Sequence, residues 1–323
     1  MFTKTTLLKA LLLAATFMLP GMSQAQNYPT KPIKFLVPYP AGGTTDVLAR
    51  LVAEKVGAKF GQPVIVENRG GAGGNIGAEA VWRASADGYS LLFASAGPLA
   101  INKNLYPKLG YDQDTFTPIS LIAASPNVLI ASTKLPVNSL TQLIAYAKAN
   151  PDRISYASQG NGSTSHLTGE FFKSAAGVKM VHVPYRGSSP AIMDVLAGQV
   201  DVMFVELSSV VAHIRAGTVQ ILAVASKQRN PMLPTIPAVA EVLPNFTSDT
   251  WFGLVAPPKM APEIANKLSA AVADALKQPS LVTAMKELGL ESIGSTPAAM
   301  SQFTKHESER WGGIIRATNT TVE

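Results

Sequence analysis

The sequence contains no cysteine among its 323 residues, and only 15% of the residues are charged. Without cysteine the chain can form neither a disulfide bond nor a thiolate metal site. The four histidines do not follow the H-x-x-x-H spacing of a zinc site, so no metal is expected. A G-x-S-x-G nucleophile motif and a P-loop lysine are also missing. These absences argue against a hydrolase, an NTPase and a metalloenzyme.

Neither positive nor negative charge is present in large excess. The formal net charge is +6, and it falls to +4, with 25 basic against 21 acidic residues, if the first 25 residues and their two lysines are removed. The basic residues are spread along the chain and form no run that could follow a phosphate backbone. No nucleic-acid partner is therefore expected.

The first 25 residues have the pattern of a signal peptide. Two lysines precede an apolar stretch at residues 10–18, and small residues stand at positions 23 and 25. A membrane anchor is the alternative, but the apolar stretch is short for a bilayer. No cysteine follows that would carry a lipid. We expect cleavage between Ala25 and Gln26 and a mature protein in the periplasm.

The remaining chain alternates between strand-like and helix-like segments, which predicts an α/β fold with mostly parallel strands. A weak duplication accompanies this alternation, because each half contains three predicted strands, each followed by a loop rich in glycine or serine and by a helical segment. Any α/β protein repeats itself to some extent in this way, so the duplication alone does not identify a fold. The predicted strands are residues 33–37, 63–68, 87–95, 153–158, 179–185 and 200–206.

Two loops stand out as candidate binding elements. Loop A, residues 41–46, follows the first predicted strand, and loop B, residues 158–166, follows the first predicted strand of the second half. Ligands of parallel sheets bind at the carboxyl ends of strands, so the two loops are expected to face one cleft. Their glycines allow a ligand to approach the backbone, and their hydroxyl groups can donate hydrogen bonds. The hydroxyl groups can equally cap the following helices, and capping is the favoured role of Asp46.

A glycine-rich segment at residues 70–77 resembles a dinucleotide-binding motif. Its spacing is one residue too long, and the next strand ends in FAS without the acidic residue that would hold a ribose. We interpret the segment as a turn that leads into a helix, and no cofactor is expected.

Two apolar segments, residues 125–140 and 251–264, are predicted to cross between two lobes. The helical segments after the second crossing would return to the first lobe. This predicts a discontinuous lobe 1, residues 26–124 plus 255–323, and a lobe 2 of residues 125–254.

Several motifs together resemble the solute receptors of tripartite tricarboxylate transporter systems, the Bug-type periplasmic binding proteins. The resemblance covers essentially the whole chain after the leader. It is carried by PYPAGGTTD, GQPVIVENRGGAGGNIGAEAV, DGYSLLFAS, YASQGNGSTSHLTGEFFKSAAGV, VHVPYRGSSPAIMDVLAGQVDVMF, WFGLVAP and the closing ERWG.

The resemblance implies a type II-like, two-lobed periplasmic binding fold with two hinge crossings. It implies a monomer that closes on a small organic acid (a di- or tricarboxylate, an amino acid or an aromatic acid) and docks on a two-subunit membrane permease. Backbone N–H groups of the loops would hold the ligand's carboxylate. The residues carried over to this cleft are Ala41, Gly42, Gly43, Thr44, Thr45, Ser95, Asn161, Ser163, Thr164, Ser165, Tyr185 and Gly187.

One position departs from the family pattern. After VDVMF the family more often has an acid followed by a small polar residue, whereas this chain has Val205 and Glu206. A carboxylate at Glu206 near the cleft would repel a second ligand carboxylate or hold an amine, although a packing role is equally consistent with the pattern. An exported enzyme or a ligand sensor on the same scaffold is the alternative function, but no convincing nucleophile, base or metal cluster supports the enzyme.

Overall fold

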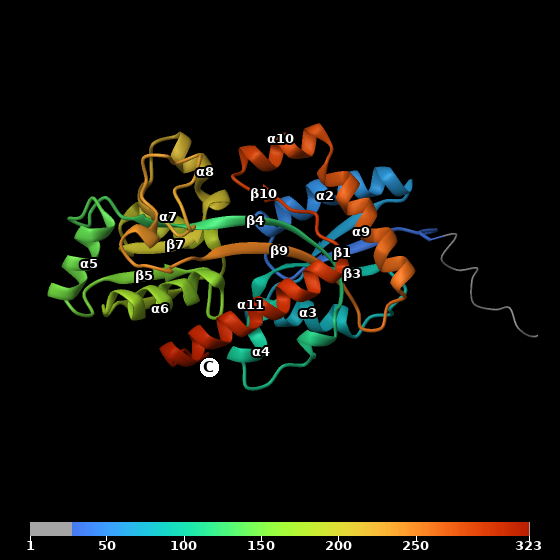
Figure 1. Ribbon diagram of the computed structural model, residues 1–323, viewed down its shortest axis with the longest axis horizontal. Coiled ribbons are helices and arrows are strands. Elements are labelled where there is room, and N and C mark those ends of the chain that lie inside the picture. Colours follow the sequence, from blue (N-terminus) through green and yellow to red (C-terminus); the bar gives the residue numbers. More distant parts are fainter. Residues whose placement is uncertain (1–27, 323) are drawn as a thin grey trace, which may run out of the picture.

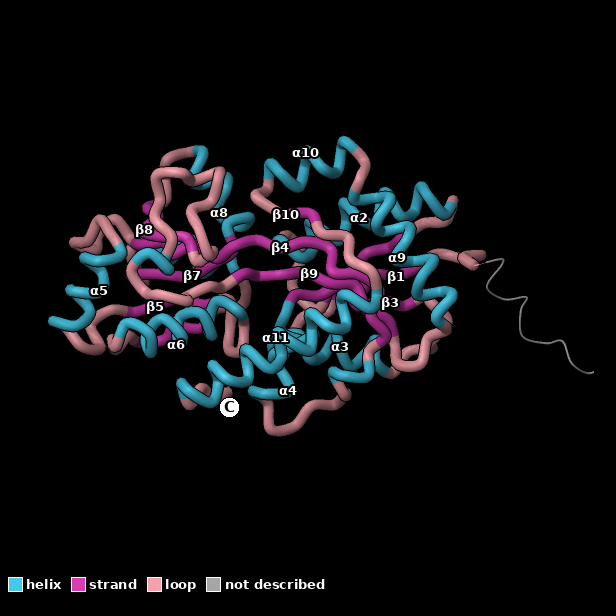
Figure 2. The backbone as a smooth tube through the Cα atoms, in the orientation of Figure 1, coloured by secondary structure: helices cyan, strands magenta, loops and turns pink. Residues whose placement is uncertain are grey.

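The computed structural model describes residues 28–322. The predicted signal peptide and its cleavage site lie outside the described residues. The molecule is elongated and has two lobes, which are joined through the strands β4 and β9 (Figure 1). The smooth tube in Figure 2 shows these two strands running side by side between the lobes.

Lobe 1 is built on three parallel strands in the order β2-β1-β3. They agree with the three predicted strands of the first half, although β3 begins later than expected. In β1 all residues but one are buried, because helices cover both faces of a parallel sheet. The elements are β1 (Ile33–Val37), α2 (Thr44–Phe60), β2 (Val64–Asn68), α3 (Asn75–Trp82) and β3 (Ser90–Ser95).

Lobe 2 repeats this arrangement with the parallel order β6-β5-β7. The duplication predicted from sequence is therefore present in the architecture. The strand β8 (Gln220–Val224), which pairs with β4, was not predicted. The other elements are α5 (Leu140–Ala149), β5 (Ser155–Ser158), α6 (Thr164–Ala176), β6 (Val181–Pro184), α7 (Ser188–Ala197), β7 (Val202–Glu206) and α8 (Leu207–Arg215).

The centre of the sheet is antiparallel, because the two crossing strands run in opposite directions between the lobes. Residues 117–126 of β4 (Thr117–Ala131) pair with β9 (Asp249–Ala256), and residues 127–131 pair with β7. Two crossings were predicted, but β4 begins eight residues before the predicted segment 125–140. The prolines and serines in the first half of β4 obscured its strand pattern. The division into 26–124 plus 255–323 and 125–254 stays a prediction.

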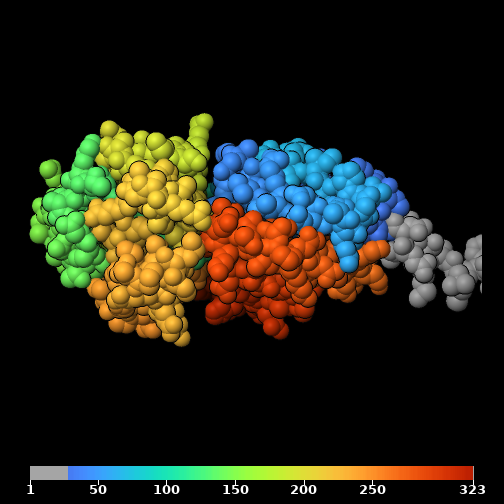
Figure 3. Space-filling model, turned by 90° about the horizontal axis from the view of Figure 1, so that it is seen from above, coloured from blue at the N-terminus to red at the C-terminus, as the bar shows by residue number. Residues whose placement is uncertain are grey.

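The C-terminal helices pack mainly against elements of the first half of the chain. Helix α9 contacts α2 and β4, whereas α11 contacts β4 and also α6 of lobe 2. The space-filling view in Figure 3 shows the seam between the lobes, with these helices (orange to red) beside lobe 2 (yellow). The remaining elements are η2 (Ala72–Gly74), η3 (Gly97–Ile101), α4 (Asn102–Leu105), η4 (Gln113–Thr115), η5 (Val239–Glu241), α9 (Pro262–Leu276), α10 (Pro279–Glu287), β10 (Glu291–Ser292) and α11 (Pro297–Thr318).

The apolar core extends across the boundary between the lobes. Leu167 of α6 is fully buried in a cluster whose other members lie in lobe 1 or on the crossing strands, including Leu105, Trp251 and Trp311. Opening the lobes at this side would expose an apolar side chain to water, which costs free energy. The contact therefore favours the closed arrangement seen here.

Candidate ligand-binding site

Loop A connects β1 to the first turn of α2. Gly42 has a φ angle of 86°, a left-handed conformation that glycine adopts easily, and its N–H donates to Asp46 Oδ2 at 2.9 Å. Arg50 lies 2.9 Å from the other oxygen of Asp46. Burial alone would raise the pKa of Asp46, but the ion pair with Arg50 and the hydrogen bond from Gly42 outweigh it and lower the pKa. Asp46 therefore holds loop A from within the first turn of α2. The prediction that it caps the helix was wrong, because the N-cap position is Gly43 and no side chain caps α2.

Loop B connects β5 to α6, and its hydroxyl groups are used inside the protein. Ser163 caps α6 by accepting from the N–H of His166 at 3.2 Å. Thr164 Oγ1 lies 2.9 Å from Thr250 Oγ1, and Ser165 donates to the carbonyl of Phe204. Because these hydroxyl groups already have partners, a ligand at loop B would meet backbone groups and the exposed Asn161.

The two lobes touch directly at the predicted cleft. Thr44 Oγ1 of lobe 1 lies 3.3 Å from Glu206 Oε1, 3.2 Å from Ser208 Oγ and 3.1 Å from Ser209 Oγ, all in lobe 2. The glycine-rich segment 70–77 also reaches loop B, because a Cβ added to Gly73 would lie 3.5 Å from the Asn161 carbonyl oxygen. The fold thus brings together Thr44 and Glu206, which are 162 residues apart.

Glu206 lies at the end of β7 and is only 5% exposed. Its Oε1 accepts from Ser209 at 2.7 Å and from Thr44, and its Oε2 accepts from the side-chain amide of Gln159. Burial raises the pKa of Glu206, and these hydrogen bonds oppose that rise. The side chain is therefore a buried acid in contact with both lobes.

The other predicted site residues lie at neighbouring strand ends. Ser95, at the end of β3, is hydrogen-bonded to the hydroxyl of Tyr39 at 2.8 Å. The hydroxyl of Tyr185 donates to Asp194 Oδ2 at 2.6 Å, so it stabilises α7. Gly187 N–H donates to the Gln159 carbonyl at 3.1 Å, which attaches the start of α7 to loop B.

Sequence reasoning missed three polar residues at this site. Gln159, Ser208 and Ser209 all contact Glu206 or Thr44. Each follows directly after the end of a strand, or lies in the first turn of the helix that follows it. The same rule that selected loops A and B, applied to the end of β7, would have found the two serines.

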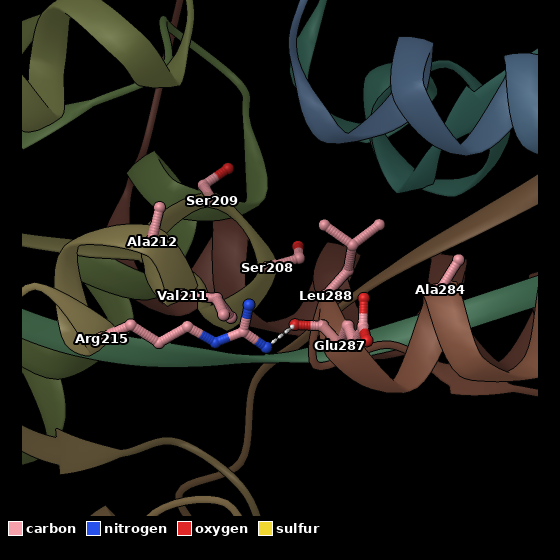
Figure 4. Close-up of a pocket in the computed structure, with 8 residues that line it drawn as sticks. All are labelled: Ser208, Ser209, Val211, Ala212, Arg215, Ala284, Glu287 and Leu288. Atoms are coloured by element: carbon pink, nitrogen blue, oxygen red, sulfur yellow. Dashed lines mark hydrogen bonds between the residues drawn. The ribbon is translucent and has the colours of Figure 1, made fainter.

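A cavity of about 350 Å³ lies beside the site, between α8 and α10 (Figure 4). Arg215 crosses it and donates to the carbonyl of Glu287 at 3.0 Å, so a side chain of lobe 2 holds the end of a lobe 1 helix. A second cavity of about 380 Å³ lies in lobe 1 between η4 and α11. Neither cavity is lined by loop A or loop B, which contact the opposite lobe directly.

Two stacked histidines, His166 and His182, hold loop B through hydrogen bonds. His166 is buried, and its Nδ1 accepts from the N–H of Gly162 at 3.2 Å. Its ring stacks on His182 at 4.0 Å, and His182 Nε2 lies 2.7 Å from Ser158 Oγ. Both histidines therefore have structural partners within lobe 2. His213 and His306 lie elsewhere, and the described residues include no group of three or more potential metal ligands.

These histidines predict a loss of stability at acidic pH. Burial lowers the pKa of His166 to about 4 and that of His182 to about 3, and for His182 the neighbouring His166 adds to the effect. The unfolded chain, with histidine pKa values near 6.5, then binds more protons than the folded chain below pH 6.5. Stability is therefore lost as pH falls from about 6.5 towards 4, and His166 accounts for roughly 3 kcal/mol.

The measurement is urea unfolding at a series of pH values for the wild type and His182→Phe. Phenylalanine keeps the ring stack but cannot be protonated, so we expect the free energy of unfolding to fall less steeply below pH 6.5, by roughly 1–2 kcal/mol at pH 4 after allowance for partial exposure. His213→Phe, at a half-buried position in the last turn of α8, is the control. Equal slopes in wild type and His182→Phe would contradict the assignment.

Both the sequence and the fold of this chain are similar to those of known proteins. Residues 48–320 match the family described as tripartite tricarboxylate transporter family receptor. The R. palustris protein Rpa4515 with adipate has a TM-score of 0.87 at 36% identity, covering 91% of this chain and 99% of that one. The periplasmic binding protein BugD has a TM-score of 0.85 at 36% identity, covering 92% and 100%.

MatC from Rhodopseudomonas palustris, with bound malate, has a TM-score of 0.84 at 32% identity, covering 89% of this chain and 100% of that one. Among relatives known by sequence, protein BugT of Bordetella pertussis is 37% identical over 302 residues, which is 93% of each chain.

Two lobes joined by two crossing strands, with helices beginning at the strand ends between them, define the periplasmic-binding-protein fold. The two-lobed α/β architecture predicted from sequence is thereby confirmed. Within that class, the chain belongs to the receptor family of the tripartite tricarboxylate transporters. This is a periplasmic family of solute-binding receptors, and no helix within residues 28–322 is long and apolar enough to cross a membrane.

Proposed function

We propose that this protein captures a small organic carboxylate between loop A of lobe 1 and the neighbouring starts of α6 (loop B) and α7 in lobe 2, and delivers it to the membrane permease of a tripartite tricarboxylate transporter. The proposal rests on one observation: α2 in lobe 1 and α7 in lobe 2 both begin without a side-chain cap. Each of the two helices begins directly after a glycine, Gly43 or Gly187.

Uncapped helix starts suit a carboxylate ligand. The first N–H groups of a helix have no partner within the helix, and the helix dipole places partial positive charge there. Space also permits the approach, because a Cβ added to Gly42, Gly43 or Gly187 would meet no atom within 4 Å. Each well-made hydrogen bond to a charged group contributes about 1.5–3 kcal/mol.

The relatives support the same assignment. Structures of two family members contain adipate and malate, both small dicarboxylates. We infer that the leader directs this chain to the periplasm, where it binds its ligand as a monomer without cofactor or catalysis. A sensor that presents bound ligand to a membrane partner would use the same cleft.

The experiment begins with mass spectrometry of the ligand released when freshly purified protein is denatured. The affinity of the free acid and of its methyl ester is then measured by calorimetry. Because full esterification removes the negative charge of every carboxylate, we expect the fully esterified ligand to bind at least about tenfold more weakly, which corresponds to the loss of about 1.4 kcal/mol. An ester that binds as tightly as the free acid would overturn the carboxylate assignment.

Lys34→Gln is a suitable control variant for these measurements. Lys34 pairs with Glu67 on the surface of lobe 1 and is expected not to affect binding. Arg50, which the sequence placed outside the binding loops, is not suitable, because the structure shows it holding Asp46 at the base of loop A.

A further inference from the structure

We propose that Glu206 determines ligand specificity, an inference that rests on the proposed function. Glu206 selects carboxylates that also carry a hydrogen-bond donor, such as an ammonium or amide group. It disfavours dicarboxylates that lack such a donor. Glu206 is suited to this role because its carboxylate is buried and touches both lobes at the cleft.

The charge of Glu206 has no counter-charge nearby. All three of its hydrogen-bond donors, Ser209, Thr44 and Gln159, are neutral. No ion pair within residues 28–322 involves Glu206. A buried carboxylate without a cation favours a positive partner and repels a negative one.

One acceptor position of Glu206 remains unused. A carboxylate has about four acceptor positions on its two oxygens. Among the described residues, Oε1 accepts from two side chains, whereas Oε2 accepts only from Gln159. Oε2 therefore offers a ligand N–H group an acceptor position that none of these donors occupies.

Glu206 also lies close to where the ligand's own carboxylate would bind. Its partner Thr44 is the first residue of α2, directly after Gly43 with its uncapped helix start. An anion held there lies within a few residue lengths of the buried acid, and like charges at such separations are unfavourable. A ligand that brings its own donor or positive charge relieves this repulsion, whereas a second carboxylate adds to it.

The test compares ligands that share one carbon skeleton. Butanoate and hexanoate are each used in three forms: unsubstituted, with a terminal amino group, and with a second terminal carboxylate. Their affinities for the full mature protein are measured by calorimetry, and the ligand released from purified protein is tested for an amine or amide group. We expect the amino forms to bind at least tenfold more tightly than the dicarboxylates, and we expect the released ligand to be a carboxylate with an amine or amide group.

Glu206→Gln separates specificity from folding. Glutamine has the same shape and retains an acceptor oxygen, but it carries no charge, so the preference for amino forms over dicarboxylates should shrink at least tenfold. Glu206→Asp keeps the charge and should keep the preference, and Glu67→Gln on the outer surface of lobe 1 is the matched control.

The outcomes distinguish the two proposals. Dicarboxylates that bind the wild type as tightly as the amino forms, or a released dicarboxylate without an N–H donor, would overturn the role of Glu206 and leave the receptor function intact. If no carboxylate is released and none of the six compounds binds, the proposed function itself fails.

Discussion

Replacing Glu307 by alanine is expected to lower the free energy of unfolding by about 3–5 kcal/mol, the usual cost of breaking a buried, hydrogen-bonded charge. Glu307 lies on α11 and is 8% exposed. Its Oε2 accepts from the indole N–H groups of Trp251 and Trp311, each at 3.0 Å. Without this oxygen, two buried donors would have no acceptor.

The same carboxylate also connects α11 to the crossing strand. Glu307 pairs with Arg310 at 3.3 Å, and Arg310 in turn donates to the carbonyl of Thr247, two residues before β9. The substitution would therefore disturb the packing of both tryptophans and the support of one crossing. The closing ERWG motif of the sequence includes two members of this network.

The measurement is urea unfolding followed by far-ultraviolet circular dichroism, because two of the three tryptophans lie beside the substitution and would distort a fluorescence signal. Glu309→Ala is the matched control, since Glu309 is exposed on the same helix and should change stability by no more than about 0.5 kcal/mol. If both variants lower the free energy of unfolding by the same amount, the buried hydrogen-bond network of Glu307 does not stabilise the fold.

Replacing Gly42 by valine is expected to weaken ligand binding about a hundredfold, or about 2.7 kcal/mol. At a φ angle of 86°, a β-branched side chain is strained by about 1–3 kcal/mol, so the loop must change conformation. That change breaks the Gly42–Asp46 hydrogen bond and moves the start of α2, where the ligand's carboxylate is proposed to bind. Calorimetry with the ligand identified from purified protein gives the affinity.

Gly43→Ala is the control for this substitution. Gly43 has an ordinary extended conformation, with φ of −78°, and an added Cβ would meet no atom within 4 Å. Its methyl group should therefore leave the loop intact and reduce affinity by less than about tenfold. A Gly42→Val variant that binds as tightly as the wild type would show that loop A does not hold the ligand. The sequence had not distinguished these two glycines, because a positive φ is a property of the folded backbone.

Local sequence patterns were sufficient to predict most of the elements. The strands β1, β2, β5 and β7 and the helices that follow them begin within a few residues of the predicted positions, because the alternation of apolar runs with glycine-rich turns is a local signal. Two loops at strand ends were predicted to face one cleft, and the motifs indicated the family. By contrast, β8 and the first half of β4 were missed, since short or proline-containing strands depend on their pairing partners for stability.

The sequence by itself therefore determined the strand–loop–helix units, the absence of cysteine chemistry and the receptor family. Only the tertiary structure decided which polar groups share the cleft and what each of them does there. Thr44 meets Glu206 across 162 residues, the hydroxyl groups of loop B are bonded inside lobe 2, and Leu167 completes a core whose other members lie in lobe 1 or on the crossing strands. The physical reason is that secondary structure depends on neighbours along the chain, whereas burial, charge and hydrogen-bond partners at this site depend on two lobes closing against each other.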